Sequence, residues 1–132
     1  MQPWLGDLMT AESLTEEQQD ALFRCHRFTV YTLYDARLAA ARYLAAHADL
    51  LGQAAAPHLE RAAEIYKEIG TSVQQLRVSI EAFVESVRGK ASVDARPWTQ
   101  EVRASEIETL ARAHELDLAG MTEIEQALAK AS

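Results

Sequence analysis

Several ionisable side chains fall on helical faces that the apolar pattern predicts to be dry. His26 and His47 lie on the apolar side of a segment near the N-terminus, and His114 and Asp117 lie between apolar residues of a segment near the C-terminus. A histidine held by a carboxylate is suited to general acid–base catalysis near neutral pH. If His47, His114 and Asp117 converge inside the folded chain, they are the candidate catalytic residues.

Arg37 shares this apolar side and belongs to a candidate ligand-binding set. A charge buried without a partner is strongly destabilising, so Arg37 needs a carboxylate and Asp117 needs a donor. The two side chains can satisfy each other. His26, Tyr43 and Tyr66 complete the set, because aromatic rings with a few polar groups line many small-molecule cavities.

Two other interpretations of these residues stay open. Each can be an ordinary core or rim residue whose polar atoms bond the backbone or water. The same groups could also bind a divalent metal ion, because the interiors of helical bundles commonly hold metal sites. However, the sequence contains no Glu-x-x-His motif of di-iron bundles, and its single cysteine, Cys25, cannot build a multi-cysteine site. We expect no metal and no cofactor.

Three long segments with helical periodicity must position these residues. In the first, Ser13 and Glu16, or Thr15 and Gln18, have the spacing of a capping box, so a helix should start near residue 15. Its apolar pattern continues to Gly52. In the second, Pro57 suits the first turn of a helix that should end at Gly89. The apolar residues of this helix recur at alternating spacings of three and four, which is a heptad seam. The seam consists of Leu59, Ala62, Tyr66, Ile69, Val73, Leu76, Ile80, Phe83 and Val87.

The third segment begins after Thr99, which is a suitable N-cap, and should run to about residue 130. His114 and Asp117 fill two positions of its heptad seam and should therefore face the core. The apolar members of this seam are Ile107, Leu110, Met121, Ile124 and Leu128. His58, beside Pro57 at a helix start, is expected at the surface.

Helices of roughly 30 to 35 residues are rods of about 45–50 Å. Because their connections are short, neighbouring helices must run antiparallel. The sequence therefore predicts an all-α fold, an antiparallel bundle of three long helices in a single domain over residues 1–132. A short helical turn at residues 3–10 should precede the bundle, and a dimer could complete a larger one.

Composition and charge limit the possible partners. The chain has 20 acidic and 13 basic residues and a formal net charge of −7. Because a negative surface repels phosphate backbones, we expect no nucleic-acid partner. No stretch approaches 18 consecutive apolar residues, and the N-terminus lacks the pattern of a signal peptide. We therefore expect no membrane association and a cytoplasmic protein.

Two short motifs and a later set of residues carry a resemblance to a known family. Residues 37–44 form R-x-x-A-A-x-Y-L, and residues 59–66 read L-E-R-A-A-E-I-Y. The later set consists of Arg103, Glu106, Ile107, Leu110, Ala111, Glu115, Leu116, Ile124, Glu125, Ala127 and Leu128. Over residues 30–128 the chain resembles the helical C-terminal region of bacterial proteins similar to butirosin-biosynthesis protein H. In that family a C39-peptidase-like domain precedes this region and carries the catalytic chemistry, and nothing around Cys25 resembles its nucleophile. The resemblance implies an accessory or binding module.

We interpret the chain as a non-catalytic helical bundle that acts as a binding or oligomerisation module in a bacterial pathway, with a natural-product pathway implied by the resemblance alone. Its expected partner is a second copy or another helical protein, and a small-molecule ligand is possible. The alternative is a small enzyme or ligand-sequestering protein with an interior pocket formed by Arg37, His47, His114 and Asp117. A polar cavity in which these side chains meet would favour the alternative.

Overall fold

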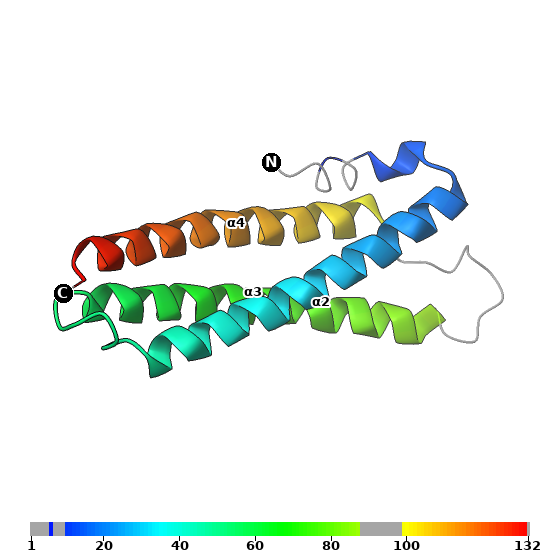
Figure 1. Cartoon of the computed structure of the whole chain (residues 1–132). Coiled ribbons are helices and arrows are strands. Elements are labelled where there is room, and N and C mark those ends of the chain that lie inside the picture. Colours follow the sequence, from blue (N-terminus) through cyan, green and yellow to red (C-terminus); the bar gives the residue numbers. More distant parts are fainter. Residues whose placement is uncertain (1–5, 7–9, 88–98, 132) are drawn as a thin grey trace.

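The computed structural model describes residues 6, 10–87 and 99–131, and these residues form helices and turns only (Figure 1). A 3-10 helix, η1 (Ala11–Ser13), precedes three long helices, α2 (Glu16–Ala46), α3 (Ala56–Val87) and α4 (Gln100–Ala129). The predicted all-α class and the three long helices are confirmed. The helical turn predicted over residues 3–10 lies almost entirely outside the described residues.

Of the two capping boxes that the sequence offers for α2, the structure forms the one at Thr15, and α4 begins at the predicted cap Thr99. The Thr15 side chain accepts a hydrogen bond from the Gln18 amide, and the Gln18 side chain accepts one from the Thr15 amide, which completes a capping box. At the start of α4, the Thr99 side chain accepts from the Val102 amide. These bonds satisfy N–H groups that have no partner inside the helix.

Helix α2 ends earlier than predicted. Its last residue is Ala46, and turns lead from there to Gly52, whose φ of 95° lies in the left-handed region that glycine adopts easily. The apolar pattern continues through these turns because Leu51 packs against a small core cluster that includes Ala55 and Leu59. Periodicity alone does not distinguish a turn that packs on the core from one more turn of helix.

Helix α3 is the central helix of the bundle. It packs closely against both α2 and α4, and it runs antiparallel to each of them (Figure 1). Helices α2 and α4 therefore run parallel to each other. They lie nearest at their N-terminal ends and diverge toward their C-terminal ends, because α2 crosses α3 obliquely.

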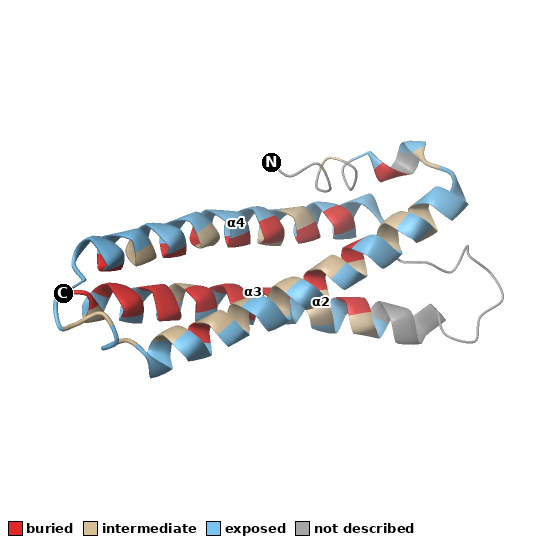
Figure 2. Ribbon diagram, viewed as in Figure 1, coloured by how far each residue is buried: buried red, intermediate tan, exposed pale blue. Residues whose placement is uncertain are grey.

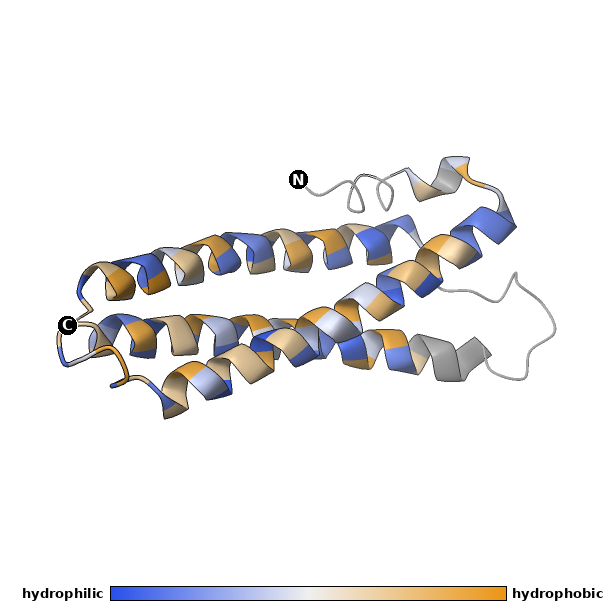
Figure 3. Cartoon of the chain, in the orientation of Figure 1, coloured by the Kyte–Doolittle hydropathy of each residue, from blue (hydrophilic) through white to orange (hydrophobic). Residues whose placement is uncertain are grey.

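The predicted seam of α3 forms the core (Figure 2). The members of this seam from Leu59 to Ile80 are all buried, and the side chains of Phe83 and Val87 lie outside those that the structure describes. Hydrophobic and hydrophilic residues alternate along all three helices, as amphipathic helices require (Figure 3).

Helix α4 buries a different stripe from the predicted one. Leu110 is buried, but Met121 and Leu128 are exposed. The buried residues of α4 are Arg103, Glu106, Leu110, Ala113, Leu116, Gly120 and Ala127. The prediction followed the large apolar side chains, whereas the stripe that is buried in the C-terminal half includes the small residues Gly120 and Ala127. The position of the buried stripe on α4 determines which residues of this helix can line a site.

Candidate functional site

Two ion pairs connect α2 to α4. His26 Nε2 lies 2.8 Å from Glu106 Oε2, and both side chains are shielded from water, with exposed fractions of 0% and 6%. Arg37 Nη2 donates to Asp117 Oδ2 at 2.8 Å, and Arg37 Nε lies 2.7 Å from Asp117 Oδ1. The pairing that the sequence predicts for Arg37 and Asp117 is confirmed.

The two ion pairs share one register. Each pair joins residues 80 positions apart, and 11 residues separate His26 from Arg37 as they separate Glu106 from Asp117. Eleven residues are about three helical turns, so the paired residues lie on one stripe of each helix. The His26–Glu106 pair joins the N-terminal halves of α2 and α4, and the Arg37–Asp117 pair joins their C-terminal halves.

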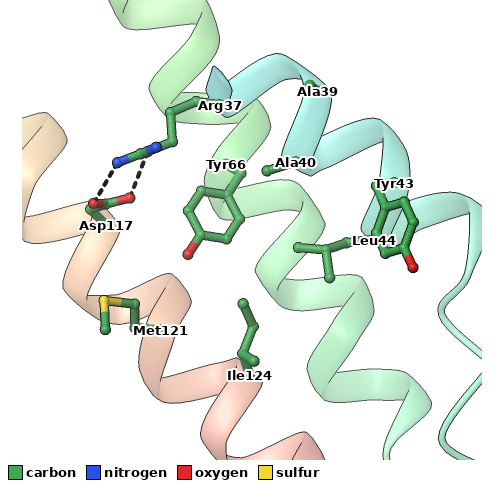
Figure 4. Close-up of a pocket in the computed structure, with 9 residues that line it drawn as sticks. All are labelled: Arg37, Ala39, Ala40, Tyr43, Leu44, Tyr66, Asp117, Met121 and Ile124. Atoms are coloured by element: carbon green, nitrogen blue, oxygen red, sulfur yellow. Dashed lines mark hydrogen bonds and ion pairs between the residues drawn. The ribbon is translucent and has the colours of Figure 1, made fainter. Parts of the chain in front are cut away.

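Beyond this pair, the space between the helices is a cavity of about 560 Å³ (Figure 4). Arg37 and Asp117 lie at one end, and the Tyr66 ring rises from α3 between the two walls. Leu44 of α2 and Ile124 of α4 point toward each other across the space. The cavity lining consists of Arg37, Ala39, Ala40, Tyr43, Leu44, Tyr66, Asp117, Met121 and Ile124. A mostly apolar cavity of this size with few polar groups is typical of a binding site.

Tyr66 is held in place by the close approach of α4. A Cβ atom at Gly120 would lie 3.0 Å from Tyr66 Cζ and 3.2 Å from its hydroxyl oxygen, so glycine leaves the space that the ring occupies. Burial raises the pKa of Tyr66, the nearby Asp117 carboxylate raises it further, and Arg37 partly opposes the change. The hydroxyl therefore stays protonated at neutral pH and can donate a hydrogen bond.

Of the three candidate catalytic residues, Asp117 lines this cavity, but His47 and His114 do not. His47 is exposed, its Nδ1 lies 2.9 Å from the Tyr43 carbonyl oxygen, and its ring stacks on the Tyr43 ring at 4.3 Å. His114 is exposed on α4 and does not line the cavity. The prediction that both histidines face the dry interior is wrong, because the C-terminal halves of α2 and α4 diverge and leave these faces open to water.

The predicted ligand-binding residues divide into two groups. Arg37, Tyr43 and Tyr66 line the cavity together with Asp117, whereas His26 lies fully buried in its pair with Glu106. Glu106, the partner of His26, was not among the predicted site residues. Its position four residues before Leu110, on one helical face, is the signal that could have identified it as buried.

A second polar cluster joins α3 to α4. His58 Nδ1 lies 2.7 Å from both Glu123 Oε2 and Arg61 Nη2, and Arg61 Nε lies 3.2 Å from the same carboxylate oxygen. The hydrogen bond with His58 lowers the pKa of Glu123, burial partly offsets this, and Arg61 lowers the pKa further. His58 is buried, so its predicted surface position is wrong.

A third cluster lies between α2 and α3. The Tyr31 hydroxyl donates a hydrogen bond to Glu81, and the Arg77 guanidinium lies over the rings of Tyr31 and Tyr34, 5.1 Å and 4.9 Å from their centroids. Burial raises the pKa of Tyr31, and the hydrogen bond to Glu81 raises it further, while Arg27 lowers it. These residues do not line the cavity. Their contacts join α2 to α3 and stabilise the interface between the two helices.

Other kinds of site have no support in the described part of the chain. Its histidine, cysteine and acidic side chains form no group of three that could hold a metal ion. None of its helices combines the length and the apolar character needed to cross a membrane. Comparison with known proteins gives no match to a protein-family model, to a curated protein or to a solved structure.

Proposed function

We propose that this chain is a non-catalytic binding module, and that the groove between α2 and α4 docks an amphipathic helix of a partner protein. We define this groove by Ala40, Tyr43 and Leu44 on α2, by Met121 and Ile124 on α4, and by Tyr66 between them, all of which line the cavity. We include Leu118 and Leu128, which extend the exposed apolar stripe of α4 beyond the cavity. The observation that carries the proposal is that α4 has a second apolar stripe, which the bundle leaves uncovered.

The exposed stripe has the form of a helix-docking surface. Leu118, Met121 and Leu128 are 53%, 50% and 59% exposed, and they recur with Ile124 at the spacings of one helical face. Apolar side chains at this spacing are how one helix recognises another in a groove. An exposed apolar stripe beside a cavity marks an interaction site more often than an isolated surface leucine does.

The polar groups at the cavity support binding rather than catalysis. Both oxygens of Asp117 are engaged by Arg37, and the histidines that could transfer a proton, His47 and His114, are exposed. An acid–base mechanism needs a group within hydrogen-bonding reach of a bound substrate.

One observation favours a second candidate function, the binding of a small molecule. Four residues singled out in the sequence, Arg37, Tyr43, Tyr66 and Asp117, line the same cavity. If a small apolar ligand occupies the cavity alone, titration with a fragment library should shift the NMR signals of the Tyr66 ring and leave those of Leu128 unchanged. A docked helix should shift both.

Helix docking can be tested with a designed peptide. We choose a 21-residue amphipathic helix, with leucine at its heptad positions and glutamine on its flanks, labelled with a fluorophore. Fluorescence anisotropy should show that it binds the wild-type chain. Met121→Glu should weaken binding by about tenfold or more, because it places a charge in the apolar stripe.

Val78→Glu is the matched control. Val78 is 61% exposed on α3, lies outside the groove and receives the same change of charge, so binding should persist in this variant. The proposal fails if the wild-type chain does not bind the peptide, or if both variants weaken binding equally.

A further inference from the structure

The two walls of the groove differ in charge. On α4, Glu125 is exposed one turn after Met121 and one turn before Leu128, so its carboxylate stands beside the apolar stripe. On α2, the residues one turn from Tyr43 carry no formal charge when histidine is neutral. They are Ala39, Ala40, Ala46 and His47.

Several other charges lie near the groove. Arg42 is exposed beside Tyr43 and shares its face of α2 with the exposed Asp35. Arg37 and Asp117 neutralise each other at the closed end of the groove, and Arg112 Nη1 donates to Glu115 Oε2 at 3.3 Å on the outer side of α4. Among the described residues of the stripe, Glu125 is the carboxylate without an ionic partner. Glu125 and the net charge of −7 of the whole chain both favour a cationic partner over an anionic one.

Building on the proposed function, we infer that the occupant of the groove is a basic amphipathic helix, with lysine or arginine beside its apolar stripe. A cationic side chain near the stripe pairs with Glu125, and the net charge of the chain attracts such a helix from a distance. A second copy of this chain is a poor occupant. It brings the same Glu125 and the same net charge, so like charges approach each other across the interface.

The shape of the groove agrees with a helical occupant. On the α2 wall, the small side chains Ala39 and Ala40 leave room beside the larger Tyr43 and Leu44, while the α4 wall carries Met121 and Ile124. A helix can therefore lie close to α2 and direct one large apolar side chain into the cavity above Tyr66. That side chain serves as the anchor, since buried apolar side chains near the centre of an interface carry most of its binding energy.

The inference is tested with three peptides that share one apolar stripe and differ in their flanking residues, which are lysine, glutamine or glutamate. At 50 mM salt, anisotropy titration should give a dissociation constant for the lysine peptide about three- to tenfold below that of the glutamine peptide. The glutamate peptide should bind most weakly. Raising the salt to 500 mM should bring the three values together.

Glu125→Lys separates the local charge from the net charge. In this variant the lysine peptide should bind more weakly and the glutamate peptide more tightly, while the affinity of the glutamine peptide stays within twofold of wild type. Glu68→Lys is the control, because Glu68 is exposed on α3 about 200° around the helix from Tyr66. Glu68→Lys changes the net charge by the same amount as Glu125→Lys. Its effect on the affinities of the lysine and glutamate peptides should be clearly smaller.

The outcomes distinguish this inference from the proposed function. If all three peptides bind equally well and Met121→Glu weakens them all, the groove docks helices but the charge inference is wrong. If Glu68→Lys acts as strongly as Glu125→Lys, the local role of Glu125 is wrong. If sedimentation shows a dimer that Met121→Glu dissociates, the occupant is a second copy. If no peptide binds, the proposed function itself is wrong.

Discussion

At the scale of residues, the surroundings shift the pKa values of Tyr66 and Glu123 in opposite directions. Tyr66 lies near the Arg37–Asp117 pair and Gly120, and burial and the Asp117 carboxylate both raise its pKa. The contacts with His58 and Arg61 lower the pKa of Glu123. The pKa of Tyr66 therefore depends on the cavity, and that of Glu123 depends on the contact between α3 and α4.

Asp117→Asn should lower the pKa of Tyr66, because it removes the carboxylate that disfavours the tyrosinate. The pKa should stay above its ordinary value of 10.0, since burial is the larger cause of the increase. NMR titration of 13C-labelled tyrosine rings measures this change. The Tyr31 ring, which contacts Glu81 and Arg77, is the internal control and should titrate as in the wild type. An unchanged Tyr66 titration would contradict the geometry of the cavity.

At the scale of elements, α4 has two apolar stripes with different roles. Leu110→Ala should lower the free energy of unfolding by about 2–5 kcal/mol, because Leu110 is buried against the core. Leu128→Ala should change it by less than about 1 kcal/mol, because Leu128 is largely exposed. Urea denaturation of the two variants compares the same substitution on the two stripes. A large loss in Leu128→Ala would mean that the second stripe is part of the core.

The two helical glycines should respond differently to alanine. At Gly120 a Cβ would meet the Tyr66 ring, whereas at Gly70 it would meet Leu38 Cδ2 at 3.0 Å and Cγ at 3.1 Å. Alanine gains about 1 kcal/mol in helix propensity at either position. The leucine can change rotamer, so Gly70→Ala should be nearly neutral, but the packed ring cannot, so Gly120→Ala should destabilise by about 1 kcal/mol or more.

Thermal denaturation of these variants measures the difference, and a further change tests its cause. Combining Gly120→Ala with Tyr66→Leu should cost less than the sum of the two single changes, because the smaller side chain makes room for the new methyl group. Simple additivity would show that Tyr66 and Gly120 do not interact.

At the scale of the whole molecule, stability should depend on pH through Glu123. Its pKa is below the ordinary value of 4.5, so its contacts with His58 and Arg61 stabilise the fold above that value, and this contribution is lost as the pH falls through the lower, folded-state pKa. Glu123→Gln should therefore melt below the wild-type temperature at pH 7, and the difference should disappear in strong acid.

Glu125→Gln provides the comparison for this measurement. It makes the same chemical change on an exposed carboxylate of the same helix, and its melting temperature at pH 7 should match that of the wild type. A difference between Glu123→Gln and the wild type that persists at pH 2 would show that the effect is not caused by ionisation.

The sequence by itself determined the three helices, the start of α2 near residue 15, the cap at Thr99 and the seam of α3. It also showed that Arg37 and Asp117 each need a partner and can serve each other, and the structure pairs them. These features depend on local periodicity, on capping chemistry and on the cost of an unpaired charge, all of which are properties of residue types and their spacing. The tertiary structure alone decided which stripe of α4 is buried. That choice depends on the angle at which α2 crosses α3, which leaves His47, His114, Met121 and Leu128 exposed and opens the groove beside Tyr66. A heptad pattern specifies that a face is apolar, but the positions of the neighbouring helices determine whether that face is covered.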